Sequence, residues 1–318
     1  MSGTKPGRIG DIPLAGVADL LAEVQSVKKK ERMPFPMPWA EIADGLGGGF
    51  RPGEVTTIAG QAGNGKSFIA LTVCYNLQLA NIPWRYLPLE DNAGQVTRRM
   101  SALLFDDWKM IDMDYRKASE QETKIVKNLK AIHSLSRSIC QNPRKWALNP
   151  NTKKPYIPDV PWSLVCDWVG ALAETSDAKL IVVDPVKQID FDEPKQPWWR
   201  VQEKFVRTIT AMADRSGVHV ILVNHLRGRS GKDRKESATM EDMGGSAAFR
   251  DLVHNVLLLE AHDEKTSAIV VNGDLSKANY KRTLSIEKCR NGSGRALRFA
   301  MDFTSPYMAC LGQICKEK

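Results

Sequence analysis

The chain has 318 residues, 42% of them hydrophobic, which is enough for one large or two modest domains with a sizeable core. Lys and Arg number 45 against 37 Asp and Glu, and the net charge of +8 favours an acidic partner such as nucleic acid, although many basic proteins bind none. The six cysteines form no C-x-x-C pair and the five histidines complete no zinc pattern, so reduced thiols are expected rather than disulfides or a zinc module. No signal-peptide core and no apolar run of membrane-spanning length is present, so we expect a soluble, cytoplasmic protein without a membrane partner.

The first 32 residues differ in character from the main domain, which we place at residues 33–318. Residues 1–12 are expected to be flexible. Residues 13–30 predict an amphipathic linker helix, because apolar side chains recur there at helical spacing: Leu14, Val17, Leu20, Leu21, Val24 and Val27. Three prolines within residues 33–39 then require an extended segment. The residues themselves leave open whether this helix packs on its own domain or on another subunit.

A glycine-rich turn over residues 45–53 leads into the clearest motif of the chain. Residues 54–59 predict a short buried strand, and residues 67–77 predict an apolar helix. Between them every fixed position of the pattern G-x-x-x-x-G-K-[ST] is matched, by the run Gly60, Gln61, Ala62, Gly63, Asn64, Gly65, Lys66 and Ser67. Glycine lets this backbone wrap closely round an oxyanion, and the helix N-terminus faces it. The motif predicts ATP and Mg²⁺ as cofactors, with Lys66 on the β- and γ-phosphates, Ser67 on the metal, and Phe68 adjoining the loop.

Three later strand candidates each end in a polar side chain, where a parallel sheet opens its ligand crevice. Residues 84–89 end at Glu90, which could polarise the water that attacks the γ-phosphate. The alternative is that Asp91 caps the next helix and Glu90 is merely solvated. Residues 179–184 end in Asp184, an acid placed to hold Mg²⁺. Residues 218–225 end in His225, a candidate γ-phosphate sensor, although a structural histidine is the simpler alternative.

The rest of the chain predicts helices and two basic segments. Helical patterns cover residues 95–103, 119–135, 162–174 and 200–215, and we interpret residues 106–160 as a variable insertion with an exposed loop. A mobile basic loop follows His225, and we expect it to contact nucleic-acid phosphates rather than only solvent, through Arg227, Arg229, Lys232, Arg234 and Lys235. Residues 244–250 open a small-residue helix and residues 253–260 predict a strand. Residues 283–301 predict a strand, a basic turn and a strand, with Lys288 and Arg290 near the turn.

This set of motifs resembles the RecA-like ATPase core of DnaB-type hexameric replicative helicases and the helicase half of phage primase–helicases, over about residues 33–310. The family pattern L-E-x-x-x-x-Q-x-x-x-R is matched by Leu89, Glu90, Gln95 and Arg99. Residues 243–250 are similar to the family's G-S-x-x-x-x-Q/R segment, and residues 286–292 are similar to its K-x-R-N-G motif.

The resemblance implies an α/β fold: a RecA-like P-loop NTPase with a mostly parallel central sheet flanked by helices and a C-terminal β-hairpin. It implies Glu90 as the catalytic base and His225 as the γ-phosphate sensor. Lys288 and Arg290 would reach the ATP of the neighbouring subunit, with Arg290 as the arginine finger. A ring-shaped homo-oligomer, expected to be hexameric, would then translocate on single-stranded or forked DNA and hydrolyse ATP between subunits. The helix at residues 13–30 would favour docking on the neighbour.

The resemblance also has departures. About 33 residues precede the core, too few for the N-terminal helical domain of bacterial DnaB, so we expect a minimal phage or plasmid helicase that acts in the host cytoplasm with a separate primase or loader. Two alternatives stay open: a RecA/RadA-like recombinase that forms filaments, and a non-translocating DNA-binding regulatory ATPase. The K-x-R-N-G segment favours the helicase over the recombinase.

Overall fold

The computed structural model describes residues 33–111, 118–142, 144, 158–226, 239–245, 247–304 and 306–315, together with residues 21 and 25 and four two-residue strands at 8–9, 12–13, 147–148 and 155–156. Most of the predicted helix at residues 13–30 therefore lies outside the described residues. None of the helices in these ranges is long and apolar enough to cross a bilayer.

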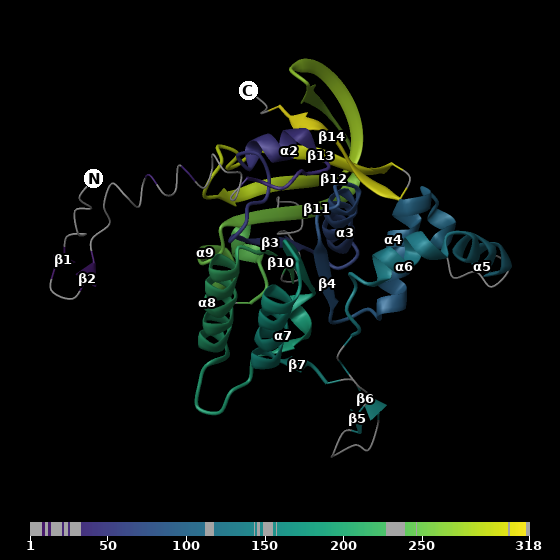
Figure 1. The fold of residues 1–318 in the computed structure, drawn as a ribbon. Coiled ribbons are helices and arrows are strands. Elements are labelled where there is room, and N and C mark those ends of the chain that lie inside the picture. The colour runs from purple at the N-terminus through teal and green to yellow at the C-terminus, as the bar shows by residue number, and fades with distance from the viewer. Residues whose placement is uncertain are drawn as a thin grey trace.

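An eight-stranded mixed sheet forms the centre of the fold (Figure 1). Its strands in spatial order are β12 (Asp274–Cys289), β13 (Arg298–Thr304), β14 (Tyr307–Ile314), β11 (Asn255–Val271), β3 (Val55–Gly60), β10 (His219–His225), β8 (Leu180–Asp184) and β4 (Trp84–Pro88). The run from β11 to β4 is parallel, and β12 to β14 are antiparallel additions. The predicted α/β class with a mostly parallel core sheet is confirmed.

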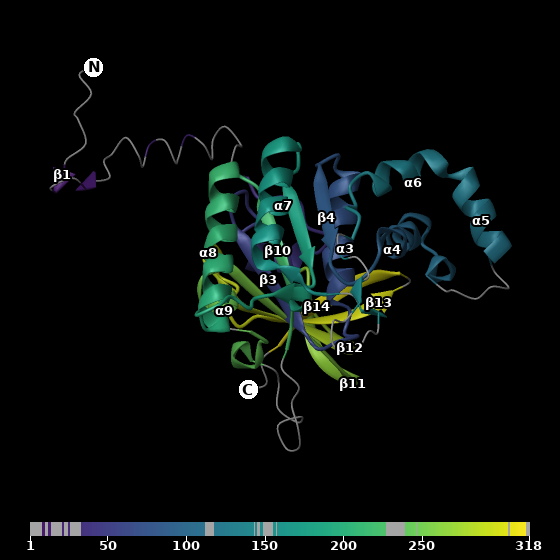
Figure 2. The same ribbon diagram turned by 90° about the horizontal axis from the view of Figure 1, so that it is seen from below.

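Helices cover both faces of the parallel strands (Figure 2). One face carries α2 (Ala40–Gly45), α3 (Lys66–Leu79), α4 (Ala93–Phe105) and α6 (Leu129–Ser136), and the other carries α7 (Trp162–Thr175), α8 (Trp198–Ser216) and α9 (Ala248–Asp251). Alternate strand residues enter the two cores: Val182 packs toward α3, whereas Ile181 and Val183 pack toward α7 and α8. Burial on both faces explains why these strands are mostly apolar along their length, without a strict alternation of apolar and polar residues.

The remaining elements are short or peripheral. They are β1 (Arg8–Ile9), β2 (Ile12–Pro13), η1 (Trp108–Met110), α5 (Ala118–Lys127), β5 (Ala147–Leu148), β6 (Pro155–Tyr156), β7 (Val160–Pro161), η3 (Val186–Gln188), β9 (Ile189–Asp190) and η5 (Met240–Asp242). Residues 33–39 have no regular structure, as the three prolines predicted.

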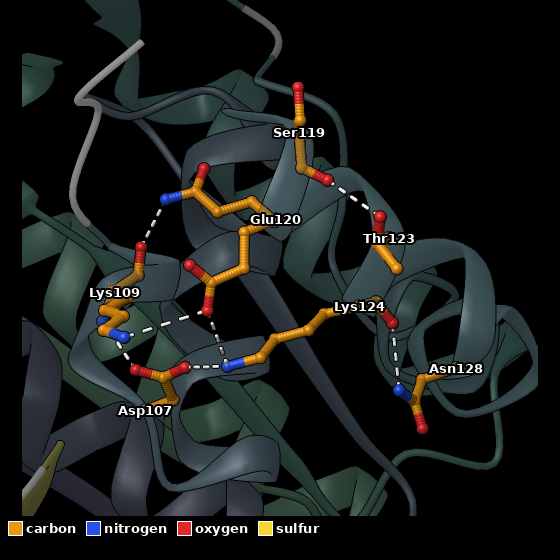
Figure 3. Close-up of polar contacts among 8 residues, drawn as sticks. Asp107, Lys109, Ser119, Glu120, Thr123, Lys124 and Asn128 are labelled. Carbon is orange, nitrogen blue, oxygen red and sulfur yellow. Dashed lines mark hydrogen bonds and ion pairs between the residues drawn. The ribbon is translucent and has the colours of Figure 1, made fainter. Parts of the chain in front are cut away.

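The predicted insertion at residues 106–160 contains two helices: α6, which packs against α4 with Leu135 in the core, and α5, which lies farther from the sheet (Figure 2). A polar network ties α5 to the chain just after α4 (Figure 3). There Lys124 forms ion pairs with Asp107 and with Glu120, the latter at 3.8 Å, and Glu120 also lies 3.8 Å from Lys109. Hydrogen bonding to Lys124 lowers the pKa of the Asp107 carboxyl. No residue of α5 is fully buried, and this network links the helix to the segment just after α4.

The C-terminal strands differ from the prediction. β11 extends to Val271 and turns into β12 through Asn272 and Gly273, whose φ angles of 52° and 91° are those of an Asn-Gly hairpin turn. The antiparallel strands on either side of the basic turn are confirmed as β12 and β13. The turn itself is wider than a hairpin, because pairing stops at Ser285 with Arg298 and residues 290–297 form a loop.

Candidate nucleotide site

The loop at residues 60–66 leaves the carboxyl end of β3 and turns into α3. Gly65 caps that helix with φ at 103°, and Gly63 has φ at 79°, both in the left-handed region that favours glycine. A side chain at Gly60 would put its Cβ 2.5 Å from the carbonyl oxygen of Leu259 on the adjacent strand. The loop geometry therefore needs glycine at these positions, and it leaves the N-terminus of α3 facing the crevice, as an anion site requires.

Lys66 lies under this loop and is only 5% exposed. Its Nζ donates to the carbonyl oxygen of Gln61 across the loop at 2.7 Å. Burial lowers the pKa of Lys66 to about 8, although the carboxylates of Asp184 and Glu90 act in the opposite direction. The three predicted residues Lys66, Glu90 and Asp184 are thus close enough to influence one another.

Asp184 ends β8 beside the start of α3. Its buried carboxylate accepts hydrogen bonds from the hydroxyls of Ser67 and Tyr86. Burial raises the pKa of Asp184, while both hydroxyls and Lys66 act to lower it. Ser67 and Asp184 supply oxygen donors of the type that Mg²⁺ prefers, and they fit it as a partial set that nucleotide phosphates and water would complete. In the described part of the chain, no cluster of three His, Cys, Asp or Glu side chains forms a metal site of its own.

The backbone bend at Leu89–Asp91 carries Glu90, whose side chain is exposed. Asp91 forms an ion pair with Arg99 on α4. Asn92, and not Asp91, caps α4: its side chain accepts from the N–H of Gln95, whose side chain accepts from the N–H of Asn92 in return. The alternative role of Asp91 as the helix cap is therefore wrong, because Asp91 is already engaged by Arg99. Glu90 is left free to face the crevice, and its catalytic role stays a prediction.

His225 ends β10 directly beside the start of the loop, in register with Gly60. A cavity of about 590 Å³ adjoins it, lined also by Gln61, Lys187 and Gln202. Burial first, and then the charges of Lys66 and Lys187, lower the pKa of His225 to about 4. The imidazole is accordingly neutral near pH 7. Its position fits the predicted sensor, which stays a prediction.

The predicted basic loop begins at Arg227, two residues after His225. Arg227, Arg229, Lys232, Arg234 and Lys235 all lie outside the described residues. Both flanks of the loop are described. Leu226 forms a bridge with Met243, and the N–H of Gly244 donates to the carbonyl oxygen of His225 at 2.7 Å. Leu226, Met243 and Gly244, which flank the loop, therefore lie beside His225.

Lys288 and Arg290 lie away from the other predicted site residues of the same chain. Lys288 pairs with Val256 near the amino end of β11, and its Nζ donates to the carbonyl oxygens of Arg250 and Asp251 at 3.0 and 2.7 Å. Arg290 is exposed, and the next residue, Asn291, bonds to Glu54 just before β3. At a rise of about 3.3 Å per residue, Glu54 is about 20 Å from Gly60. Lys288 and Arg290 therefore lie toward the amino ends of the parallel strands, on the side of the sheet opposite the phosphate loop of the same chain.

Sequence reasoning missed two side chains that border the loop. Arg282 on β12 donates from Nε to the carbonyl oxygen of Asn64 at 3.0 Å, and its guanidinium lies 4.4 Å from the ring centre of Phe303. The Phe303 ring packs edge-on against the predicted loop residue Phe68 at 5.3 Å. No local motif marks either residue, because β12 and β13 reach the loop only through the folded sheet.

Comparison with known proteins supports the RecA-like fold and nucleotide binding. The family model of the DnaB-like helicase C-terminal domain matches residues 41–309. No curated protein matches the chain.

A structure of a DnaB-like replicative helicase, described with its interactions with primase, superposes with a TM-score of 0.66 at 14% identity, covering 93% of this chain and 66% of that one. This chain thus spans just under two thirds of that helicase. A second solved structure, described as an ATPase domain, superposes with a TM-score of 0.63 at 11% identity, covering 94% of this chain and 99% of that one. The chain belongs to the DnaB-like helicase C-terminal domain family.

Proposed function

We propose that this protein is the ATP-hydrolysing motor of a replicative DNA helicase, which works as a ring of identical subunits and translocates on single-stranded DNA. The observation that carries the proposal is the position of Lys288 and Arg290. Within one subunit they lie at the opposite edge of the sheet from Lys66. A neighbour's Lys288 and Arg290 can complete the site only if subunits stack head to tail, an arrangement that gives either a closed ring or an open filament. The match to the DnaB-like helicase family over residues 41–309 favours the ring.

The chemistry at each interface is hydrolysis of the γ-phosphate. Ser67 and Asp184 would hold Mg²⁺, which supplies positive charge against the phosphate oxygens. Glu90 accepts the proton of the attacking water, and Lys66 with the backbone of the loop binds the β- and γ-phosphates. An arginine added in trans stabilises the transition state and contributes on the order of 10³ in rate or more, so hydrolysis depends on assembly.

Coupling to DNA is proposed to run through His225. Its carbonyl oxygen accepts from the N–H of Gly244, and it lines the same cavity as Gln61 and Ala62 of the phosphate loop, so one residue contacts both the nucleotide crevice and the base of the basic loop. Residues 227–235 would hold the DNA backbone by phosphate contacts. A separate primase or loader is a further proposed partner, since one similar structure is described with primase.

A forked-duplex assay tests the function. Purified protein with ATP and Mg²⁺ is expected to unwind the fork, to hydrolyse ATP faster with single-stranded DNA, and to form rings by negative-stain microscopy. Helical filaments with strand pairing would identify the recombinase instead. DNA binding that requires ATP, without unwinding, would identify the regulatory ATPase. Absence of DNA-stimulated hydrolysis in a verified oligomer would reject the helicase.

A further inference from the structure

Two side chains from the insertion donate hydrogen bonds to the backbone around Glu90. Asn142 donates from Nδ2 to the carbonyl oxygen of Asp91 at 2.9 Å and to that of Glu90 at 3.4 Å. Arg144 donates from Nη1 to the carbonyl oxygen of Leu89 at 3.1 Å. All three carbonyl oxygens of the Leu89–Asp91 bend therefore accept hydrogen bonds from one short segment of the chain. Sequence reasoning assigned no role to this segment.

The segment reaches the bend because residues 138–140 run alongside β4. The N–H of Tyr86 donates to the carbonyl oxygen of Ser138 at 2.9 Å, and the N–H of Cys140 donates to the carbonyl oxygen of Tyr86 at 2.8 Å. Ile139, with 7% exposure, fixes this pairing in the core. The chain that leaves α6 thus follows β4 to its carboxyl end, where Asn142 meets the bend.

Arg144 is itself held in place on both sides. Its Nε donates to the carbonyl oxygen of Pro158 at 2.8 Å, and its Nη2 forms an ion pair with Asp159 at 3.1 Å. Its backbone N–H donates to Oδ1 of Asn142 at 2.9 Å, which orients the Asn142 amide group. A planar guanidinium with several donors suits this simultaneous contact, and a lysine ammonium does not reproduce it.

The Glu90 carboxylate depends on this backbone for its position, because the Glu90 side chain is exposed and no hydrogen bond to its carboxylate is found among the described residues. On the other side of the bend, the N–H of Leu89 donates to the carbonyl oxygen of Asp184 at 2.7 Å. The Leu89–Asp91 bend is thus hydrogen-bonded on one side to Asp184 at the end of β8 and on the other side to the insertion.

We propose that Asn142 and Arg144 are positioning residues that set the Glu90 carboxylate at its distance from the attacking water. This inference rests on the proposed role of Glu90 as the base. A general base must lie within hydrogen-bond reach of the proton it takes, and a displacement of about 1 Å can cost on the order of a hundredfold in rate. The insertion, which looks peripheral, then contributes directly to the catalytic edge of the sheet.

The test uses Asn142→Ala and Arg144→Lys in the full-length oligomer. Each is expected to lower kcat about tenfold or more with KM and the affinity for a fluorescent ATP analogue within about twofold of wild type, because only the base moves. Arg85→Lys is the matched control: Arg85 also lies on β4 and pairs with Asp177 at 3.1 Å, but at the other end of the strand, so its kcat should not change. If Arg144→Lys lowers Tm, the test relies on Asn142→Ala. That variant removes only one partly exposed side chain and should leave the fold intact.

A double-mutant cycle separates positioning from other causes. If Asn142 acts through Glu90, Asn142→Ala should cause no further loss of phosphate release in a Glu90→Gln background, measured with radiolabelled ATP. An unchanged kcat in both single variants, or an equal loss with and without Glu90, would overturn the positioning role. Wild-type turnover by Glu90→Gln alone would instead reject Glu90 as the base, and with it that part of the proposed function.

Discussion

At the scale of single residues, the burial of Lys66 has the most direct consequence for nucleotide binding. It is buried beneath the loop that it is predicted to serve, and burial lowers its pKa to about 8. Its ammonium group bonds the loop's own Gln61 carbonyl oxygen at 2.7 Å. A bound phosphate would replace that carbonyl and favour the charged form of the lysine.

This environment predicts that nucleotide affinity depends on pH. Below pH 8 the free protein already holds the proton on Lys66, so the affinity for ATP should be nearly constant there. Above pH 8 binding must take up that proton, and affinity should fall by up to about tenfold per pH unit. Titration with a fluorescent ATP analogue from pH 7 to 9.5 measures this slope. Lys66→Arg, which stays charged throughout, is the control, and an equal slope in both proteins would contradict the assignment.

At the scale of elements, the turn after α2 and the loop at residues 290–297 are interlocked. The N–H of Gly294 donates to the carbonyl oxygen of Gly45 at 2.9 Å, and Asn291 bonds to the buried Glu54. The glycine-rich turn, for which the sequence suggested no partner, thus supports the segment that presents Arg290.

Substitution of Gly294 should disturb this support. A Cβ there would lie 2.4 Å from the Gly45 carbonyl oxygen and 2.6 Å from its Cα, both backbone atoms that cannot rotate away. Gly294→Ala is expected to lower stability by about 1–3 kcal/mol and to lower ATPase activity with nucleotide affinity retained, since Arg290 moves but Lys66 does not. Thermal unfolding and steady-state kinetics measure the two effects.

Gly170→Ala on α7 is the matched control. Its Cβ would meet only the terminal Cε of Met212, at 2.9 Å, and this flexible side chain can move. Equal losses of ATPase activity in the two glycine variants would show that the 290–297 loop has no special role in hydrolysis.

At the scale of the whole molecule, the sheet separates the two halves of the proposed site. The loop at residues 60–66, Asp184 and His225 gather at the carboxyl ends of the parallel strands, whereas Lys288 and Arg290 lie toward the amino ends. In the proposed assembly a single chain would therefore present one half-site at each of these ends, as head-to-tail stacking requires.

Mixing two inactive variants tests that arrangement. Arg290→Ala should bind ATP but not hydrolyse it, and Lys66→Ala should do neither. In the mixture, an Arg290→Ala subunit supplies an intact Lys66 to an interface whose arginine comes from a Lys66→Ala neighbour, so ATPase activity should partly return. Lys66→Ala mixed with Glu90→Gln is the control, because both defects lie in the same half-site and no interface can be complete. No recovery in the first mixture would count against a trans arginine.

The sequence by itself determined the core strands and the order of the site along the chain. β3, β4, β8 and β10 were all predicted, because burial on both faces of a parallel sheet favours short, mostly apolar runs. The loop at residues 60–67 and the polar residues at the ends of these strands could be predicted equally well, since each depends on residues that are adjacent in the sequence. The cap of α4 was less certain, because Asp91 and Asn92 are both suitable caps and only the pairing of Asp91 with Arg99 separates them.

Only the tertiary structure decided which distant residues meet. β11 and β12 continue past the central sheet through mostly exposed residues that pair by backbone hydrogen bonds. Only a small apolar cluster, which includes Ile269 and Tyr280, covers this extension, so the local sequence carries little signal of it. Arg282 reaches Asn64, and Asn142 reaches Asp91, through single hydrogen bonds between segments that the sheet brings together. Such contacts have no period and no fixed spacing in the chain. The same holds for Lys288 and Arg290, whose separation from Lys66 follows from strand direction in the folded sheet.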